Sequence, residues 1–185
     1  MLFRSNGDRV IVNPLRVRNE SMREIQYNMI LYYMGSSRIS SEIIASQIKN
    51  VQQGKSKSIE AMHKLKEQAV LQKEALLKGD LTAFGKLLSY GWEHKKEMSE
   101  KISNDTIETV YAKCMNSGAL GVKVSGAGGG GFMMIYADGY NKFKVLEGLK
   151  EFPGQVIRFQ FVPHGAEAWP MQKGASRGPE GPDRV

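Results

Sequence analysis

The sequence predicts an α+β domain in which several helices pack on one face of a mostly antiparallel sheet. Three observations lead to this class: two strand-like segments near the N-terminus, a central block of helical apolar patterns, and a return to strands after residue 119. Strands that are separated by a block of helices, rather than alternating one by one with helices, favour an antiparallel sheet.

The two N-terminal strands differ in character. Residues 9–14 form a short run that Pro14 ends, because proline has no amide to donate to a strand ladder. Residues 27–34 are almost continuously apolar and stop at Gly35, which is typical of a buried strand.

Four helices are expected next. Gly79 is a natural C-cap, Asp80 can begin the following helix, and Asn104 or Asp105 can begin the fourth. The apolar residues that define these helices recur at helical spacing within residues 43–51, 59–76, 81–102 and 107–114.

Strands return in the last third of the chain. We expect strands over residues 120–125, 132–136 and 155–162, with a short helix over 141–150. The domain is expected to cover residues 1–171. Residues 172–185, which are rich in glycine and proline, are predicted to be a disordered tail.

Composition narrows the classes of function. The chain has 185 residues, 41% of them hydrophobic, and no apolar run near the roughly 18 residues of a membrane span. The single Cys114 excludes an internal disulfide and a cysteine-based zinc cluster, and the three histidines lack metal-ligand spacing. We therefore expect a reduced, cytoplasmic protein with no metal site and no membrane partner.

The net charge of +7 makes nucleic acid a candidate partner. The basic residues alternate with glutamates along the helices, however, and no block of like charges or nucleic-acid-binding motif is present. A modest basic excess suits an anionic small molecule equally well. No nucleic-acid partner is expected.

The most informative segment is a loop at residues 126–131, where five of six residues are glycine. It matches GxGxxG, but a dinucleotide fingerprint opens a helix, whereas a strand-like run follows here. A Walker A loop needs Lys-Ser/Thr, and Phe132 stands there instead. The residues leave two interpretations open: a hairpin that needs positive φ, or bare amides that face phosphate oxygens.

The longer string around this loop, residues 116–132, resembles the third conserved motif of the GHMP kinases. This family is named for galactokinase, homoserine kinase, mevalonate kinase and phosphomevalonate kinase. The likeness covers residues 8–169 and is nearest to the C-terminal half of the family's bacterial heptose 7-phosphate kinases. Besides the loop, it rests on residues 10–15, 31–38, 92–96 and 165–169.

The resemblance implies a ferredoxin-like sheet with additional helices, and a phosphotransferase that uses ATP and Mg²⁺ to phosphorylate a heptose phosphate. It places the glycine loop beside the ATP phosphates, through Ser125, Gly126, Ala127, Gly128 and Gly129. The family's main phosphate loop and its catalytic aspartate are absent from this sequence. We therefore assign no catalytic residue and expect the chain to need a separate N-terminal half.

Three cations are candidates for the sugar phosphate. Arg38 precedes a predicted helix, where amides and a guanidinium can form an anion site; ordinary capping by Ser40 is the alternative. Lys95 falls near the centre of the apolar stripe of its helix, and Lys96 falls at the edge. A lysine extending from the edge of the core is the alternative for Lys95. The resemblance favours a ligand role for the pair without assigning the contact to either lysine, and Lys123 is expected to face solvent.

A different class of function stays open beside the kinase. The chain can be a non-catalytic domain that binds a phosphorylated ligand, or a subunit of a kinase. In either case apolar surface is expected where another half would dock, so self-association into a homo-oligomer is expected.

Overall fold

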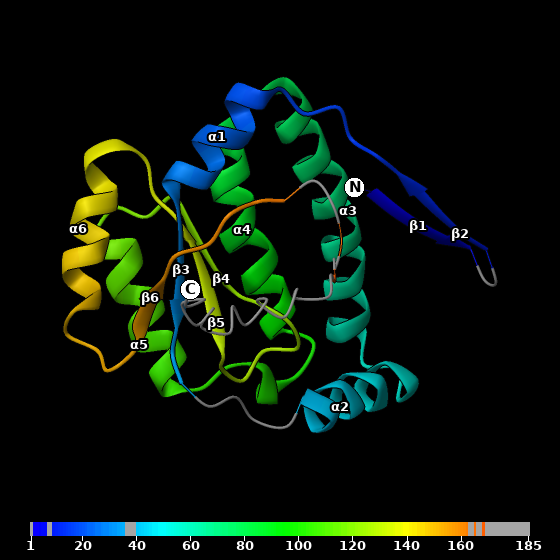
Figure 1. Cartoon of the computed structure of the whole chain (residues 1–185). Helices are drawn as coiled ribbons and strands as arrows, with labels where there is room; N and C mark the ends of the chain where they lie inside the picture. The colour runs from blue at the N-terminus through cyan, green and yellow to red at the C-terminus, as the bar shows by residue number, and fades with distance from the viewer. Residues whose placement is uncertain (1, 7–8, 36–39, 163–164, 166–167, 169–185) are drawn as a thin grey trace, which may run out of the picture.

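A computed structural model describes residues 2–6, 9–35, 40–162, 165 and 168 (Figure 1). Over these residues it shows a mixed fold of six α-helices and a four-stranded antiparallel sheet, with a separate two-stranded hairpin. The predicted α+β class is confirmed.

The strand order gives the sheet its topology. Every pairing between neighbouring strands is antiparallel, and the order across the sheet is β4-β5-β3-β6. Helices join β3 to β4, and one helix joins β5 to β6, which is the ferredoxin-like arrangement that the resemblance implies. The strands are β3 (Met29–Tyr33), β4 (Gly121–Val124), β5 (Phe132–Tyr136) and β6 (Gln155–Ile157).

The helices begin and end largely where local signals place them. Gly79 ends α3 with a left-handed φ of 74°. The Asp80 side chain accepts a hydrogen bond from Ala83, and Asn104 caps the fifth helix in the same way through Ile107. The helices are α1 (Asn19–Asn28), α2 (Ser40–Gln52), α3 (Ser56–Lys78), α4 (Leu81–Lys96), α5 (Asp105–Asn116) and α6 (Gly139–Leu149), with a 3₁₀ turn, η1 (Glu100–Ile102).

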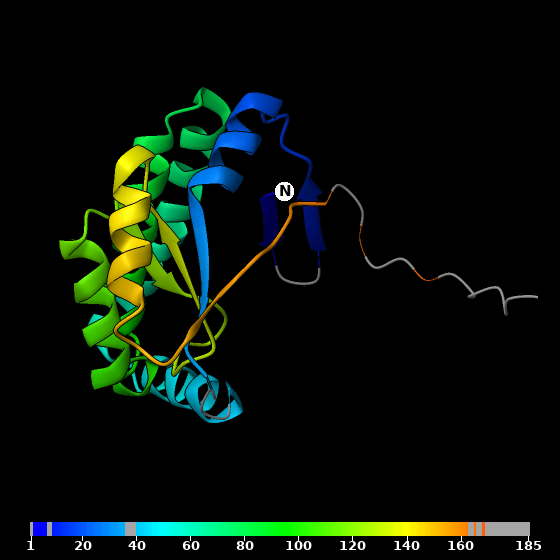
Figure 2. The ribbon, with the colours of Figure 1, turned by 60° about the vertical axis from the view of Figure 1, so that its left-hand side comes forward.

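The main core lies between one face of the sheet and helices α5 and α6 (Figure 2). Alternation along β3 sends Ile30 and Tyr32 to this face, where both are buried. Met29 and Tyr136, on the opposite alternation, join a second cluster with residues of α1, α3 and α4. The helix α4 packs closely on β4: a Cβ on Gly121 would lie 1.7 Å from the Gly85 carbonyl oxygen.

Two predicted elements have different boundaries. Tyr27 and Asn28 end α1, a helix that the sequence analysis did not predict, and β3 begins only at Met29. A short apolar run does not by itself separate a buried strand from the end of a buried helix. The last strand is shorter than expected and ends at Ile157.

The long helix predicted to reach Ile102 is broken. The helix α4 ends at Lys96, and the Ser99 side chain accepts a hydrogen bond from the Lys101 amide to begin η1. Ile102 is fully buried, so its apolar spacing reflects burial rather than continuation of the helix. This turn brings η1 against the glycine loop.

The N-terminal hairpin projects from the body of the domain (Figure 1). It consists of β1 (Leu2–Asn6), which the sequence analysis did not predict, and β2 (Arg9–Asn13). Every residue of β2 is exposed, including Val10, Ile11 and Val12. The docking surface expected from the sequence stays a prediction.

Candidate functional site

The glycine loop joins β4 to β5, as predicted. All five of its glycines have φ between 73° and 139°, a region that favours glycine. The Ser125 amide donates to the Phe132 carbonyl at 2.8 Å, and the Gly131 carbonyl accepts from Met34 at 2.9 Å. The turn therefore needs its glycines for backbone conformation, so the hairpin interpretation accounts for part of the motif.

The middle of the loop is packed against η1. The Gly129 amide donates to the Ile102 carbonyl oxygen at 2.7 Å, and a Cβ on Gly128 would lie 2.7 Å from the same oxygen. Both glycines are buried. The Gly129 amide is thus already hydrogen-bonded within the protein.

The first part of the loop is open. Ser125 and Gly126 are exposed, and a Cβ on Gly126 would meet no atom within 4 Å. Among the described residues, the amides of Gly126, Ala127 and Gly128 have no backbone hydrogen-bond acceptor. Successive free amides of this kind form a concavity that suits phosphate oxygens.

Lys95 reaches this open part from the last turn of α4. Its Nζ donates to the Gly126 carbonyl oxygen. Burial, together with the smaller effect of the positive charge of Lys123, lowers the pKa of Lys95 to about 8. The side chain is half-buried, so Lys95 brings positive charge directly to the loop.

Lys123 is a site residue that the sequence analysis missed. It lies on β4, three positions before Gly126, and it is half-buried rather than solvent-facing. Burial lowers its pKa. Strand alternation reveals which face a residue occupies, but it does not show that α4 places Lys95 opposite that residue.

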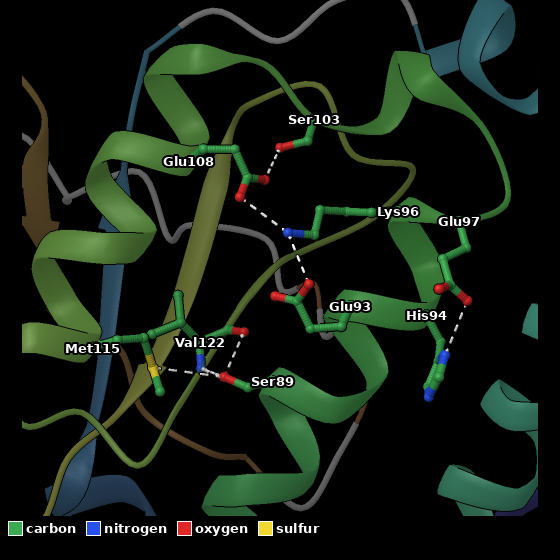
Figure 3. Close-up of polar contacts among 9 residues, drawn as sticks. All are labelled: Ser89, Glu93, His94, Lys96, Glu97, Ser103, Glu108, Met115 and Val122. Atoms are coloured by element: carbon green, nitrogen blue, oxygen red, sulfur yellow. Dashed lines mark hydrogen bonds and ion pairs between the residues drawn. The ribbon is translucent and has the colours of Figure 1, made fainter.

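Lys96 points elsewhere (Figure 3). Its Nζ lies 3.0 Å from a carboxylate oxygen of Glu93 and 3.0 Å from one of Glu108, and 5.3 Å from the centre of the Tyr111 ring. Burial alone would lower the pKa of Lys96, but the two carboxylates outweigh it and raise the pKa. Ser103 also donates to Glu108, so this network ties α4 to α5.

A separate cleft of about 440 Å³ lies on the other side of the loop. Gly129 and Gly130 line it together with Met34 and the N-terminal turn of α5. Amides at a helix N-terminus attract anions, whereas the carboxylate of Asp105 in that turn repels them.

Other predictions fall outside the described residues. Arg38 lies there, and so does the tail over residues 172–185. In the described part of the chain, no group of three or more His, Cys, Asp or Glu side chains is placed to hold a metal ion. Over the same residues, no helix is both long enough and apolar enough to cross a membrane.

The chain is similar to known proteins over most of the residues described above. Residues 72–153 match the family described as GHMP kinases C terminal. The chain is 37% identical, over 164 residues, to a D-glycero-alpha-D-manno-heptose 7-phosphate kinase from Campylobacter jejuni. That match covers 89% of this chain and 48% of the relative.

Solved structures agree in fold. A D-glycero-D-manno-heptose 1-phosphate kinase from Bacteroides thetaiotaomicron is 32% identical with a TM-score of 0.59, over 89% of this chain and 42% of its own. Mevalonate kinase from L. major, in complex with R-mevalonate, has a TM-score of 0.66 at 21% identity, over 80% of this chain and 44% of its own, and shows the fold alone. The chain therefore spans about half the length of the relatives it matches.

Proposed function

The chain carries a GHMP kinase C-terminal domain close to heptose phosphate kinases, and from this premise we propose that it is one half of an ATP-dependent sugar kinase. Its substrate is a heptose phosphate of the D-glycero-D-manno-heptose 7-phosphate type. The whole enzyme transfers the γ-phosphoryl group of ATP to a hydroxyl of that sugar in the cytoplasm. Such a reaction depends mainly on positioning and charge stabilisation.

One observation carries the proposal: a run of amides with no hydrogen-bond acceptor among the described residues begins at the exposed Gly126, and a half-buried ammonium contacts the same loop. The amides of Gly126, Ala127 and Gly128 supply hydrogen-bond donors, and Lys95 supplies positive charge at the same loop. Both groups favour an anion, and a triphosphate is an anion that extends over several such donors. We assign Ser125 to the same ATP-phosphate wall because it is exposed at the start of the loop.

The candidate cations differ in the groups that they contact. Lys95 contacts the loop, whereas Lys96 is held by Glu93 and Glu108 and supports the scaffold. Arg38 is proposed to bind the sugar phosphate. Mg²⁺ is expected to accompany ATP, and we assign it to no side chain of this chain.

We further propose that the chain alone does not transfer phosphate. The glycine loop and Lys95 bind and orient phosphate groups, but among the described residues no carboxylate or histidine is hydrogen-bonded to the loop, so no general base is assigned. Removing cooperating groups has grossly non-additive effects on rate. The exposed β2 strand is available to pair with the other half.

The experiment is an ADP-release assay with heptose 7-phosphate, run on the chain alone and on a mixture with a separately expressed N-terminal half. Turnover only in the mixture is the expected result. Turnover by the chain alone would refute the half-kinase proposal. ATP or sugar-phosphate binding with no turnover in either sample would favour the non-catalytic binding domain.

A further inference from the structure

The contact between Lys95 and the Gly126 carbonyl has a consequence for the next residue. The peptide bond from Gly126 to Ala127 is planar, and no cis peptide bond is present in the described chain. In a trans peptide the C=O and the following N–H point in opposite directions. When the Gly126 carbonyl faces Lys95, the Ala127 N–H therefore faces away from it.

Among the described residues, the contact with Lys95 is the hydrogen bond that this peptide makes. Hydrogen bonds hold the loop on both sides of this peptide: the Gly129 amide donates to the Ile102 carbonyl, and the Ser125 amide donates to the Phe132 carbonyl. Gly126 is exposed, and a Cβ added to it would meet no atom within 4 Å. Glycine also rotates more freely than any other residue, so an unheld Gly126 peptide can turn over.

The base of the Lys95 side chain is rigid, which makes it suitable as an anchor. Lys95 lies one helical turn after Trp92, whose side chain is 1% exposed in the main core. A charge-assisted hydrogen bond from a fixed ammonium is stronger than a neutral one. The loop thus receives a charge-assisted contact from outside itself at the Gly126–Ala127 peptide.

We propose that Lys95 is a positioning residue for the glycine loop, and that its ammonium holds the Gly126–Ala127 peptide with the Ala127 amide turned toward the phosphate side. This inference rests on the proposed function for the identity of the ligand. It concerns the free protein, however, so it can be tested without ATP.

Lys123 adjusts the strength of this contact. It is the charged group from β4 that acts on Lys95, and it repels the Lys95 ammonium. The acidic neighbours of Lys95 in sequence are engaged elsewhere: Glu93 of α4 contacts Lys96, and Glu97, which follows α4, contacts His94. The loop itself, residues 125–131, contains no acidic or basic side chain. Because the pKa of Lys95 is lowered to about 8, the strong form of the contact is lost as pH rises through that value.

The test follows this peptide directly by ¹³C-detected correlation of the Gly126 carbonyl carbon with the Ala127 nitrogen, from pH 6 to 10. We expect one transition with a midpoint near pH 8 in the unchanged chain. The transition disappears in Lys95→Met. In Lys95→Arg it is also absent, and the low-pH shifts persist at every pH because arginine stays charged. In Lys123→Met the midpoint moves upward, since the repulsion is removed.

A transition that survives in Lys95→Met, or a midpoint that Lys123→Met leaves in place, would overturn the proposal.

A second measurement separates this inference from the proposed function. Inorganic tripolyphosphate is titrated onto the same variants at pH 7. Lys95→Met is expected to bind about fivefold more weakly than Lys123→Met, because it loses the oriented amide as well as one charge. Equal losses in the two variants would show that charge alone matters and would refute positioning. Absence of binding in the unchanged chain, with the pH transition intact, would count against the proposed function and not against the role of Lys95.

Discussion

Replacing Lys95 by methionine is expected to stabilise the domain. Methionine keeps the unbranched apolar stem but removes a charge that is half-buried near a second lysine. The pKa of Lys95 falls from 10.5 to about 8, and each pKa unit corresponds to about 1.4 kcal/mol. The full shift would be about 3 kcal/mol, and solvent screening of a partly exposed group reduces it to about 1–2 kcal/mol.

The sign of the effect depends on pH. A lysine whose pKa is lowered on folding destabilises the native state wherever it is charged in both states, which is below about pH 8. This penalty disappears as pH rises from about 8 to 10.5, because the folded protein then binds fewer protons than the unfolded chain. The gap in stability between Lys95→Met and the unchanged chain should therefore close over that interval.

The assay is thermal and urea unfolding of both proteins at pH 7 and pH 10. At pH 7 a gain of about 1–2 kcal/mol corresponds to a Tm that is higher by about 2–8 °C for a domain of this size. The matched control is Lys66→Met on α3, an exposed lysine with no ion pair recorded among the described residues, which should change little. A Lys95→Met protein that is less stable at pH 7 would refute the reasoning, because it would mean that the contact with Gly126 outweighs the penalty of burial.

Three further predictions follow from the site. Gly128→Ala should destabilise the domain by about 2–4 kcal/mol in urea unfolding, because its Cβ meets the Ile102 carbonyl. Gly126→Ala should lose only about 1 kcal/mol, because φ is also positive there but the space is open; equal losses in the two variants would contradict the packing. Lys96→Met should lower stability by about 1 kcal/mol by leaving Glu93 and Glu108 unpaired, with tripolyphosphate binding unchanged; weakened binding would return Lys96 to the site. In a complete enzyme, Arg38→Ala should raise the KM for the sugar phosphate far more than the KM for ATP, with partial rescue by lysine; unchanged sugar kinetics would discard that assignment.

Local patterns in the sequence predict those parts of the fold that depend on short-range interactions. The caps at Gly79 and Asp80 are predicted correctly, and Asn104 is one of the two residues expected to begin the later helix, because each cap needs only its own backbone conformation or a side chain three residues from its partner. The strand–loop–strand arrangement around residues 126–131 is also predicted, since five glycines between two apolar runs favour a turn. The boundary at Asn28 is missed because a short run of this kind does not by itself separate a strand from the end of a helix.

The tertiary structure alone decides how the site is assembled. Lys95 and Lys96 are neighbours in sequence, but about 100° of helix rotation sends the first to the glycine loop and the second to Glu108 of α5. The same packing lays Ile102 against Gly128 and Gly129 and ties up the Gly129 amide, while Gly126 stays exposed. These contacts join residues that are 12 to 31 positions apart. No periodic pattern records them, because periodicity describes which face of an element is buried and not which other element covers it.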